Sequence, residues 1–415
     1  MKLIPPIPLL AALAFALPQP ARSDDVAPRP ATRLPRVFLL DPWALADARD
    51  RAAKGDAALV PALARLRRDA DTALKLTPPS VMDKKLVPPS GDKHDYMSFG
   101  PYWWPDPKKP DGLPYIRRDG KVNPARGTLD NVGLGKVCSA ADTLALAFHY
   151  TRHQPYAAHA ARLLRTWFLD PATRMNPNLN YGQAIPGRCT GRGIGIIDTT
   201  RLIRLVDAGG LLAGSEAWTD SDQKALVAWF RSYLTWLRTS KHGKAEDRTS
   251  NNHATWYDVQ VVSFALFVGD DATARTVVER APTRRIATQI QPDGRQPREL
   301  ARTKSFDYST MNLAGFFDLA TLAQHAGLDL WNFTTPDGRG IRKALDWLLP
   351  FATGEQPWRH KQLGKLRSSR ILPLLRRAAI ACREPRYEQA IAKIPDTDPS
   401  DDRFQLLYPT EVIPR

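Results

Sequence analysis

The sequence predicts an all-α protein built from helical hairpins, and three observations support this prediction. Apolar residues recur at helical spacing along most of the chain, clear alternating strands are absent, and short breakers separate successive helical stretches. Helices joined by such breakers pack as antiparallel hairpins, so we expect a toroid or a solenoid. No repeat of fixed period is evident, which weighs against a solenoid of identical units.

The clearest helical stripe begins after Thr219-Asp220, which are good N-cap residues, and comprises Leu226, Trp229, Phe230, Tyr233, Leu234 and Leu237. Similar stripes occur at Leu144/Ala147/Phe148, Ala160/Leu163/Leu164/Trp167, Leu202/Leu205/Val206, Val259/Val262/Leu266, Leu313/Phe316/Phe317/Ala320 and Ile341/Ala344/Leu345/Leu348. The breakers lie at residues 153–155, 269–271 and 327–329. Residues 78–124, rich in proline and aromatic residues, are expected to form a long irregular loop with a function.

The first 23 residues read as a secretory signal peptide. Lys2 precedes an apolar stretch that ends at Leu17, and Ala21-Arg22-Ser23 follows it. This stretch is too short to span a membrane, and no later stretch approaches the roughly 20 apolar residues that a spanning helix needs. We therefore expect a secreted or periplasmic protein without stable membrane insertion.

Charge and cysteine content narrow the kinds of partner and cofactor. The formal net charge of +16 favours an anionic partner, although charge alone does not separate acidic polysaccharide from nucleic acid or acidic lipid, and arginine richness can also follow from genomic base composition. Three cysteines without a CxxC pattern leave room for one disulfide at most. Eight histidines without an HExxH pattern predict neither a metal centre nor another cofactor.

The first candidate catalytic motif is Ser250-Asn251-Asn252-His253-Ala254-Thr255-Trp256-Tyr257, where a loop becomes a helix. Either Ser250 or Asn251 is placed to cap this helix, which leaves Asn252 and His253 in its first turn. The helix dipole there favours an anion and a neutral imidazole, which can accept a proton. In the alternative interpretation both asparagines are caps and His253 is an ordinary helix-start residue.

The second motif lies in residues 298–310, just before the next apolar stripe. Arg302 and Tyr308 are six residues apart and would face different ways on one helix, but a loop that feeds a helix can bring them together. Asp307 or Ser309 would then cap that helix. In the alternative interpretation, Arg302 is an ordinary solvent-exposed charge, and Tyr308 is an amphipathic side chain that only fills space.

Two further segments supply candidate substrate-binding residues. Amides and guanidinium groups can hold sugar hydroxyls and carboxylates, and exposed aromatic rings can stack on pyranose faces. In the alternative interpretation, the segment with Asn180 and Gln183 is an ordinary polar loop, and the Trp103-Trp104 pair is a buried anchor for a long loop. The candidates are Asn180, Gln183, Arg188, Tyr102, Trp103 and Trp104, together with Asn251 and Trp256 beside the first motif, and Arg192 and Arg201 follow the polar loop.

Taken together, the four segments resemble the alginate lyase superfamily. The Tyr-Met-Ser-Phe-Gly-Pro-Tyr-Trp-Trp-Pro stretch from Tyr96 and the Asn-Asn-His stretch from Asn251 are most similar to polysaccharide lyase family 38 and more distantly to family 5. The resemblance runs from about Arg36 to about Leu349. It implies one (α/α) toroid catalytic domain over residues 24–415, and β-elimination at a 4-linked uronic acid such as that of alginate or glucuronan.

By position in the resembling motifs, Asn252, His253, Arg302 and Tyr308 correspond to the catalytic residues of these families. Elimination requires that the uronate carboxylate be neutralised, the C5 proton removed and the O4 leaving group protonated. We expect Asn252 and Arg302 to hold the carboxylate without a metal ion and Tyr308 to protonate O4. His253 would help to neutralise the carboxylate or act as the base, depending on the C5 configuration of the sugar.

Two other functions fit parts of the sequence. An inverting glycoside hydrolase on the same toroid would need two carboxylates across the sugar, for example Glu299 or Asp307 with Asp198 or Asp258. A non-catalytic protein that binds acidic glycans would need only the basic surface. Which uronate polymer is bound, and in which oligomeric state, does not follow from the sequence.

Overall fold

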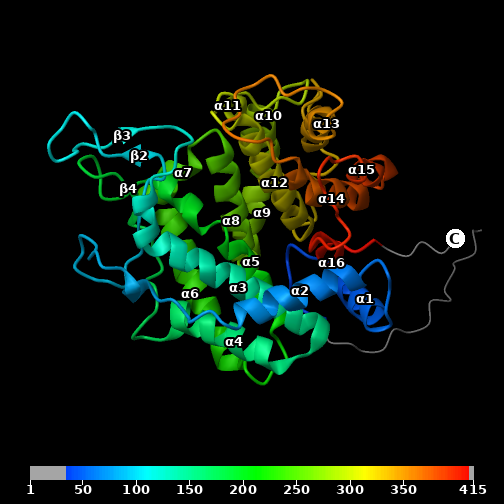
Figure 1. Cartoon of the computed structure of the whole chain (residues 1–415), viewed down its shortest axis with the longest axis horizontal. Coiled ribbons are helices and arrows are strands. Elements are labelled where there is room, and N and C mark those ends of the chain that lie inside the picture. The colour runs from blue at the N-terminus through cyan, green and yellow to red at the C-terminus, as the bar shows by residue number, and fades with distance from the viewer. Residues whose placement is uncertain (1–33, 411–415) are drawn as a thin grey trace, which may run out of the picture. The chain divides into compact units, whose positions relative to one another are not determined.

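The fold is described by a computed structural model over residues 34–410, and helices predominate in it (Figure 1). The predicted signal peptide at residues 1–23 lies outside this part of the chain. The α-helices are α1 (Pro42–Ala53), α2 (Val60–Ala73), α3 (Asp130–Thr151), α4 (Gln154–Leu164), α5 (Leu202–Leu211), α6 (Asp220–Thr239), α7 (Lys241–Asp247), α8 (Asn252–Val268), α9 (Asp271–Ala281), α10 (Ala287–Gln289), α11 (Pro297–Leu300), α12 (Ser305–Gln324), α13 (Ile341–Ala352), α14 (Leu372–Cys382), α15 (Pro385–Ile391) and α16 (Phe404–Leu407). Short 3-10 or π helices are η1 (Val81–Asp83), η2 (Pro124–Thr128), η3 (Arg165–Leu169), η4 (Gly193–Thr199), η5 (Pro282–Ile286) and η6 (Ser368–Ile371).

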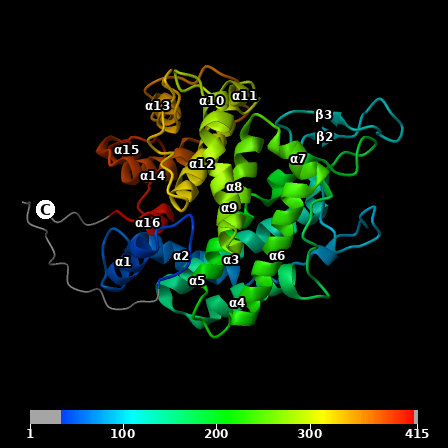
Figure 2. The same ribbon diagram turned by 180° about the vertical axis from the view of Figure 1, so that it is seen from behind.

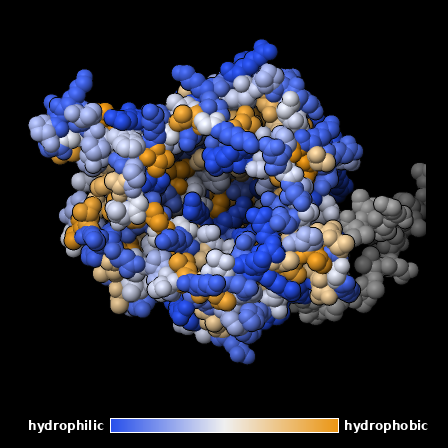
Figure 3. Space-filling model, viewed as in Figure 1, coloured by the Kyte–Doolittle hydropathy of each residue, from blue (hydrophilic) through white to orange (hydrophobic). Residues whose placement is uncertain are grey.

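The helices form two layers, and the inner layer carries the core. Helices α3, α8 and α12 are buried on nearly every side, as expected of helices that are apolar around most of their circumference. Around them, α8 packs against α5, α6, α9 and α12, while α3 packs against α2, α4 and α5 (Figure 2). This arrangement is the predicted (α/α) toroid, and Figure 3 shows one face of it hollowed at the centre.

Local sequence signals account for the ends of several helices. Thr219 caps α6 in a capping box with Asp222, as its position before the stripe predicts. The six residues of that stripe are buried on one face of α6. Arg152 and Gly269 adopt left-handed conformations at the ends of α3 and α8, so the predicted breakers do separate α3 from α4 and α8 from α9.

The predicted irregular loop contains short strands that leave no alternating pattern in the sequence. Strand β1 (Met97–Phe99) pairs in parallel with β4 (Tyr181–Ala184), and β2 (Trp103–Trp104) pairs antiparallel with β3 (Ile116–Arg117). The ends of the second pair are joined by the Asn123 N–H, which donates to the Pro101 carbonyl at 2.7 Å. We call residues 101–123 the aromatic hairpin.

A segment near the C-terminus holds the start of α12. Residues 358–363 run beside residues 303–306, with an isolated antiparallel bridge between Lys304 and Gln362. The Ser305 N–H donates to the Lys361 carbonyl at 3.0 Å, and the Leu363 N–H donates to the Thr303 carbonyl at 2.7 Å. The position of the segment that carries Tyr308 therefore depends on residues more than fifty positions later in the chain.

No helix of the described residues is long and apolar enough to cross a membrane. Cys138, Cys189 and Cys382 are all free in the structure, although the sequence left room for one disulfide.

Candidate active site

Asn252 and His253 occupy the first turn of α8, as the sequence predicts, but the helix is not capped in the expected way. Asn251 is the N-cap residue and its side chain makes no capping hydrogen bond, nor does Ser250 serve as the cap. Instead the Asn252 N–H donates to Oε1 of Glu299 at 2.7 Å. The Glu299 carboxylate thus satisfies a free N–H at the positive end of the helix dipole.

The Asn252 side chain is fixed by the same carboxylate. Its Nδ2 donates to Oε2 of Glu299 at 2.7 Å, and its Oδ1 is buried without a hydrogen-bond partner among the described residues. Burial raises the pKa of Glu299, although its bonds from Asn252 act in the opposite direction. In this fully buried side chain, Oδ1 and the second N–H of Nδ2 are thus left without a partner among the described residues.

His253 rests on a second buried carboxylate. Its Nδ1 lies 2.6 Å from Oε1 of Glu246, a residue of α7 whose side chain is 1% exposed, while the His253 side chain is 14% exposed. A carboxylate at this distance accepts the Nδ1 proton, and this tautomer leaves Nε2 with a free lone pair. Within residues 34–410, Nε2 has no hydrogen bond and is the nitrogen that can accept a proton.

Arg302 and Tyr308 converge, as the sequence predicts for a loop that feeds a helix. Arg302 Nη2 donates to the Tyr308 hydroxyl at 2.9 Å, and the guanidinium carbon lies 3.8 Å from the centroid of the Tyr308 ring. The expected caps of this helix are wrong: α12 begins at Ser305 with Lys304 as its N-cap, so Asp307 already lies in the first turn and Ser309 lies beyond it. Asp307 pairs with Arg367.

The Tyr308 hydroxyl has a second phenolic partner. Tyr102 of the aromatic hairpin lies 2.7 Å from it, oxygen to oxygen. Burial, followed by the nearby Tyr102 hydroxyl, raises the pKa of Tyr308 well above its ordinary value, and the Arg302 guanidinium opposes this shift only in part. Tyr308 is therefore a neutral phenol at neutral pH and can donate a proton.

Asp119, at the end of the same hairpin, holds Arg302. Its Oδ1 accepts from Arg302 Nη2 at 2.9 Å, and its Oδ2 accepts from the Thr303 hydroxyl at 2.9 Å. Burial alone would raise the pKa of Asp119, but the hydrogen bonds from Arg302 and Thr303 outweigh it and lower that pKa. Arg302 Nη1 has no hydrogen bond or ion pair among the residues that the structure describes.

Of the remaining aromatic candidates, Trp103 and Trp104 belong to the hairpin and Trp256 belongs to α8. Trp103 faces the guanidinium groups of Arg188 and Arg192, at 5.2 and 5.9 Å from ring centroid to guanidinium carbon. Trp104 donates through Nε1 to the Lys121 carbonyl at 2.9 Å. Trp256 is half-buried in α8, and its ring lies next to Gly315 of α12.

The polar-loop candidates bond to other parts of the protein. Gln183 is buried, and its amide binds Asp198 through Nε2 and Arg192 through Oε1. Asn180 Oδ1 accepts from Trp236, and Arg188 Nε donates to the Tyr115 carbonyl. These three residues therefore do not share the hydrogen-bond network of Arg302 and Tyr308, and their role in substrate binding stays a prediction.

The four carboxylates of the hydrolase alternative are also occupied. Glu299 serves Asn252 and Asp307 pairs with Arg367, as described above. Asp258 pairs with Arg285 at 2.7 Å, and Asp198 accepts from the Tyr96 and Ser98 hydroxyls. Each of the four carboxylates is held by a partner inside the protein, which disfavours an inverting hydrolase.

Three residues of this arrangement escape sequence reasoning. Glu246 stands in the charged stretch Lys-Ala-Glu-Asp, which reads as a solvated helix face, and Asp119 stands before Gly120 in an ordinary turn pattern. The sequence indicates Glu299 only as a candidate catalytic carboxylate of a hydrolase, and not as the partner of Asn252. Among residues 34–410, no three His, Cys, Asp or Glu side chains form a group that would hold a metal ion.

Comparisons with known proteins place this geometry in context. A model of the family described as alginate lyase matches residues 80–358. The crystal structure of an alginate lyase from Bacteroides ovatus is 40% identical with a TM-score of 0.87, and the match covers 91% of this chain and 100% of that chain. No curated protein matches the sequence.

Two more distant structures share the fold. A variant of alginate lyase A1-III complexed with a tetrasaccharide is 15% identical with a TM-score of 0.57, over 91% of this chain and 98% of that chain. Alginate lyase A1-III from Sphingomonas species A1 is 14% identical with a TM-score of 0.51, over 83% and 95% of the two chains. At these identities the likeness supports the toroid alone.

Proposed function

This chain belongs to the alginate lyase family and is a polysaccharide lyase, and from that membership we propose that it cleaves a 4-linked uronic-acid polymer of the alginate or glucuronan type by metal-independent β-elimination. The observation that carries the proposal is the bond from Arg302 Nη2 to the Tyr308 hydroxyl at 2.9 Å. It puts a cation for the uronate carboxylate beside a phenol that can protonate the leaving oxygen. We further assign the chain to polysaccharide lyase family 38 on the motifs from Tyr96 and Asn251.

The carboxylate at C5 is neutralised first. Arg302 presents Nη1 to it, since Nη2 and Nε are directed at Tyr308 and Asp119. The remaining N–H of Asn252 Nδ2 is the second donor. A carboxylate that accepts charge-assisted hydrogen bonds withdraws electrons from C5 and makes the C5 proton more acidic.

Proton removal and bond cleavage then follow. A base takes the C5 proton, the electron pair of the C5–H bond forms the C4=C5 double bond, and the C4–O4 bond breaks. O4 takes the proton of Tyr308 and leaves as a hydroxyl group. The products are an unsaturated uronate at the non-reducing end of one fragment and a new reducing end, with O4 as its C1 hydroxyl, on the other.

His253 Nε2 is the base that the geometry favours. Its Nδ1 is directed at Glu246, so the neutral imidazole keeps a lone pair on Nε2. A syn elimination by Tyr308 alone would require a tyrosinate, which the raised pKa of Tyr308 disfavours at neutral pH. The anti elimination, with His253 as base and Tyr308 as acid, needs no such ionisation.

The test is an incubation of the purified protein with polymannuronate, polyguluronate, glucuronan and hyaluronan. A lyase produces near-ultraviolet absorbance from the new double bond, and the polymer that gives it identifies the sugar. New reducing ends without absorbance would identify a hydrolase, and retention on a polymer without any product would identify a binding protein. Export through the predicted signal peptide is a separate proposal, tested by the N-terminal sequence of the protein recovered from outside the cytoplasm.

A further inference from the structure

A basic pocket lies between α2 and α3, with Arg126 of η2 in its lining. Its volume is about 800 Å³, and its polar lining includes Arg126, Asn131, Lys136, Ser139, Thr143 and Arg201. Arg126 belongs to η2, whose N-cap Asn123 donates to the Trp103 carbonyl at 2.8 Å. One wall of the pocket is therefore continuous with the hairpin that brings Tyr102 to Tyr308.

Arg201 is seated on a glycine of α3. A Cβ built on Gly135 would lie 2.6 Å from Nη1 of Arg201, so the guanidinium occupies the space that any other residue would fill. Glycine in the middle of a helix costs about 1 kcal/mol relative to alanine. The close approach of Arg201 to the helix gives a physical reason for this glycine.

Arg403 and Asp69 also line this pocket. Arg403 is paired with Asp69 and Asp142, at 3.5 and 3.4 Å. By contrast, no ion pair involves Arg126, Lys136 or Arg201 within the part of the chain that the structure describes. Arg126 Nε is also buried without a hydrogen-bond partner there. Three positive side chains without a counter-ion among the described residues thus line one pocket.

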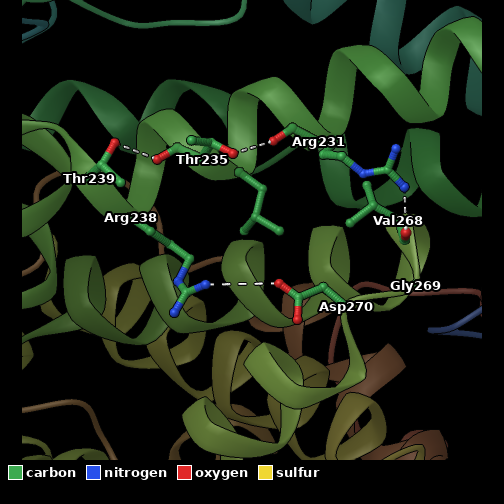
Figure 4. A pocket seen from close by; sticks show the side chains of 8 residues that line it. Arg231, Thr235, Arg238, Thr239, Val268, Gly269 and Asp270 are labelled. Atoms are coloured by element: carbon green, nitrogen blue, oxygen red, sulfur yellow. Dashed lines mark hydrogen bonds and ion pairs between the residues drawn. The ribbon is translucent and has the colours of Figure 1, made fainter.

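In another basic pocket of the same protein, the arginines do have partners inside the protein. The pocket of about 640 Å³ between α6 and the end of α8 also contains two arginines (Figure 4). There Arg231 donates to the Val268 carbonyl at 3.0 Å, and Arg238 lies 3.9 Å from Asp270. Its cations are served by the protein itself, so it does not call for an anion.

We propose that the pocket on α3 binds a carboxylate-bearing sugar of the same polyuronate chain, away from the bond that is cleaved. The inference rests on the proposed function for the identity of the ligand. Arg201 and Lys136 supply the charge, and the hydroxyls of Ser139 and Thr143 match sugar hydroxyl groups. Such a site would hold long chains and add nothing for a substrate too short to reach it.

The test compares Arg201→Ala with Arg238→Ala, which removes the same charge from the pocket of Figure 4. We expect Arg201→Ala to raise KM for the polymer roughly 3- to 10-fold with little change in kcat, because one charge-assisted contact is lost. KM for the shortest oligosaccharide that is cleaved stays the same. Equal polymer KM values for the two variants would overturn the proposal.

A second variant tests the seat of the arginine and keeps its charge. Gly135→Ala favours the helix, and its Cβ displaces only the flexible end of Arg201, so the protein is expected to fold. We expect its polymer KM to rise as well. If KM rose for Arg201→Ala but not for Gly135→Ala, the position of Arg201 against Gly135 would not matter. The proposal of a specific site would then be contradicted, because only nonspecific attraction by charge would remain.

A failure of the lyase proposal can be distinguished from a failure of the pocket proposal. If the wild-type protein produces no unsaturated ends from any polyuronate, the lyase proposal fails. The pocket is then tested by retardation of the same three variants and the wild type in gels that contain alginate. Equal retardation of wild type and Arg201→Ala would exclude an acidic-glycan site here.

Discussion

Asp119 Oδ1 accepts a hydrogen bond from Arg302 Nη2 at 2.9 Å, so the guanidinium proposed to bind the substrate carboxylate already holds a carboxylate of its own chain. The contact joins the aromatic hairpin to the loop before α12. Since Nη2 also donates to Tyr308, Asp119 fixes the orientation in which Arg302 meets both the phenol and the sugar. A residue that does not itself react, Asp119, therefore helps to orient the residues that do.

The Asp119 contact should make stability depend on pH in one direction. The pKa of Asp119 is lowered in the folded protein, so its stabilisation is complete above the ordinary aspartate pKa of about 3.9 and is lost as pH falls towards the folded value. Because the pair is partly exposed, we expect Asp119→Asn to cost up to about 1 kcal/mol at neutral pH. Urea unfolding of both proteins should show this difference shrinking below pH about 4. Asp111→Asn in the same hairpin is the control, and a difference independent of pH would contradict the assignment.

Replacement of Tyr308 should separate binding from chemistry. Tyr308→Phe keeps the ring against Arg302 but removes the proton donor, so we expect kcat to fall by about 10²- to 10⁴-fold with a similar polymer affinity. Absorbance assays and gel retardation in alginate measure the two quantities. Full activity of the variant would exclude Tyr308 as the acid.

Tyr102→Phe should move the alkaline limb of the pH profile. The Tyr102 hydroxyl contributes to the raised pKa of Tyr308, so its removal lowers that pKa. The proton donor is then lost at a lower pH than in the wild type, and kcat should decline earlier on the alkaline side. Tyr115→Phe, elsewhere in the hairpin, should leave the profile unchanged; identical profiles for Tyr102→Phe and wild type would contradict the prediction.

Glu246→Gln tests the positioning of His253. The substitution keeps the shape of the side chain but replaces the carboxylate oxygen 2.6 Å from Nδ1, which orients the imidazole, by an amide. We expect kcat to fall roughly 10- to 100-fold with little change in KM. Partial recovery in Glu246→Asp would distinguish a loss of charge from a loss of packing, and wild-type kcat in Glu246→Gln would remove the residue from the mechanism.

Glu299→Ala should lower stability, because two donors of Asn252 lose their acceptor inside the protein. Unsatisfied buried donors cost about 1–3 kcal/mol each, so we expect a loss of about 2–6 kcal/mol in the free energy of unfolding. Urea titration measures it. Glu279→Ala, at an exposed pair with Arg275, is the control and should change stability by less than about 0.5 kcal/mol. Similar values for the two variants would contradict this account.

Local pattern predicted much of the toroid and part of the site. The stripe of α6 and its Thr219 cap depend on neighbours within one or two turns, so the sequence displays them directly. The start of α8 at Asn252 and the convergence of Arg302 with Tyr308 also follow from a loop that enters a helix.

What the sequence hides are the partners that only tertiary packing brings in. Glu246 meets His253 from α7, Glu299 replaces the expected side-chain cap of α8, and Asp119 reaches Arg302 across more than 180 positions. Each contact joins separate elements, and none leaves a periodic trace. The caps expected at Asp307 and Ser309 fail for the same reason, since the segment at residues 358–363 fixes where α12 begins.

That segment has a consequence for the order of events during synthesis. Its backbone bonds to Thr303 and Ser305 can form only after Leu363 has left the ribosome, well after α8 and α12 have been made. Because chains fold from the N-terminus as they emerge, the nascent protein passes through a stage with most of its helices but an unsecured Tyr308. A chain truncated before residue 358 should therefore retain helical structure and lack activity, so that catalytic competence is acquired late in translation.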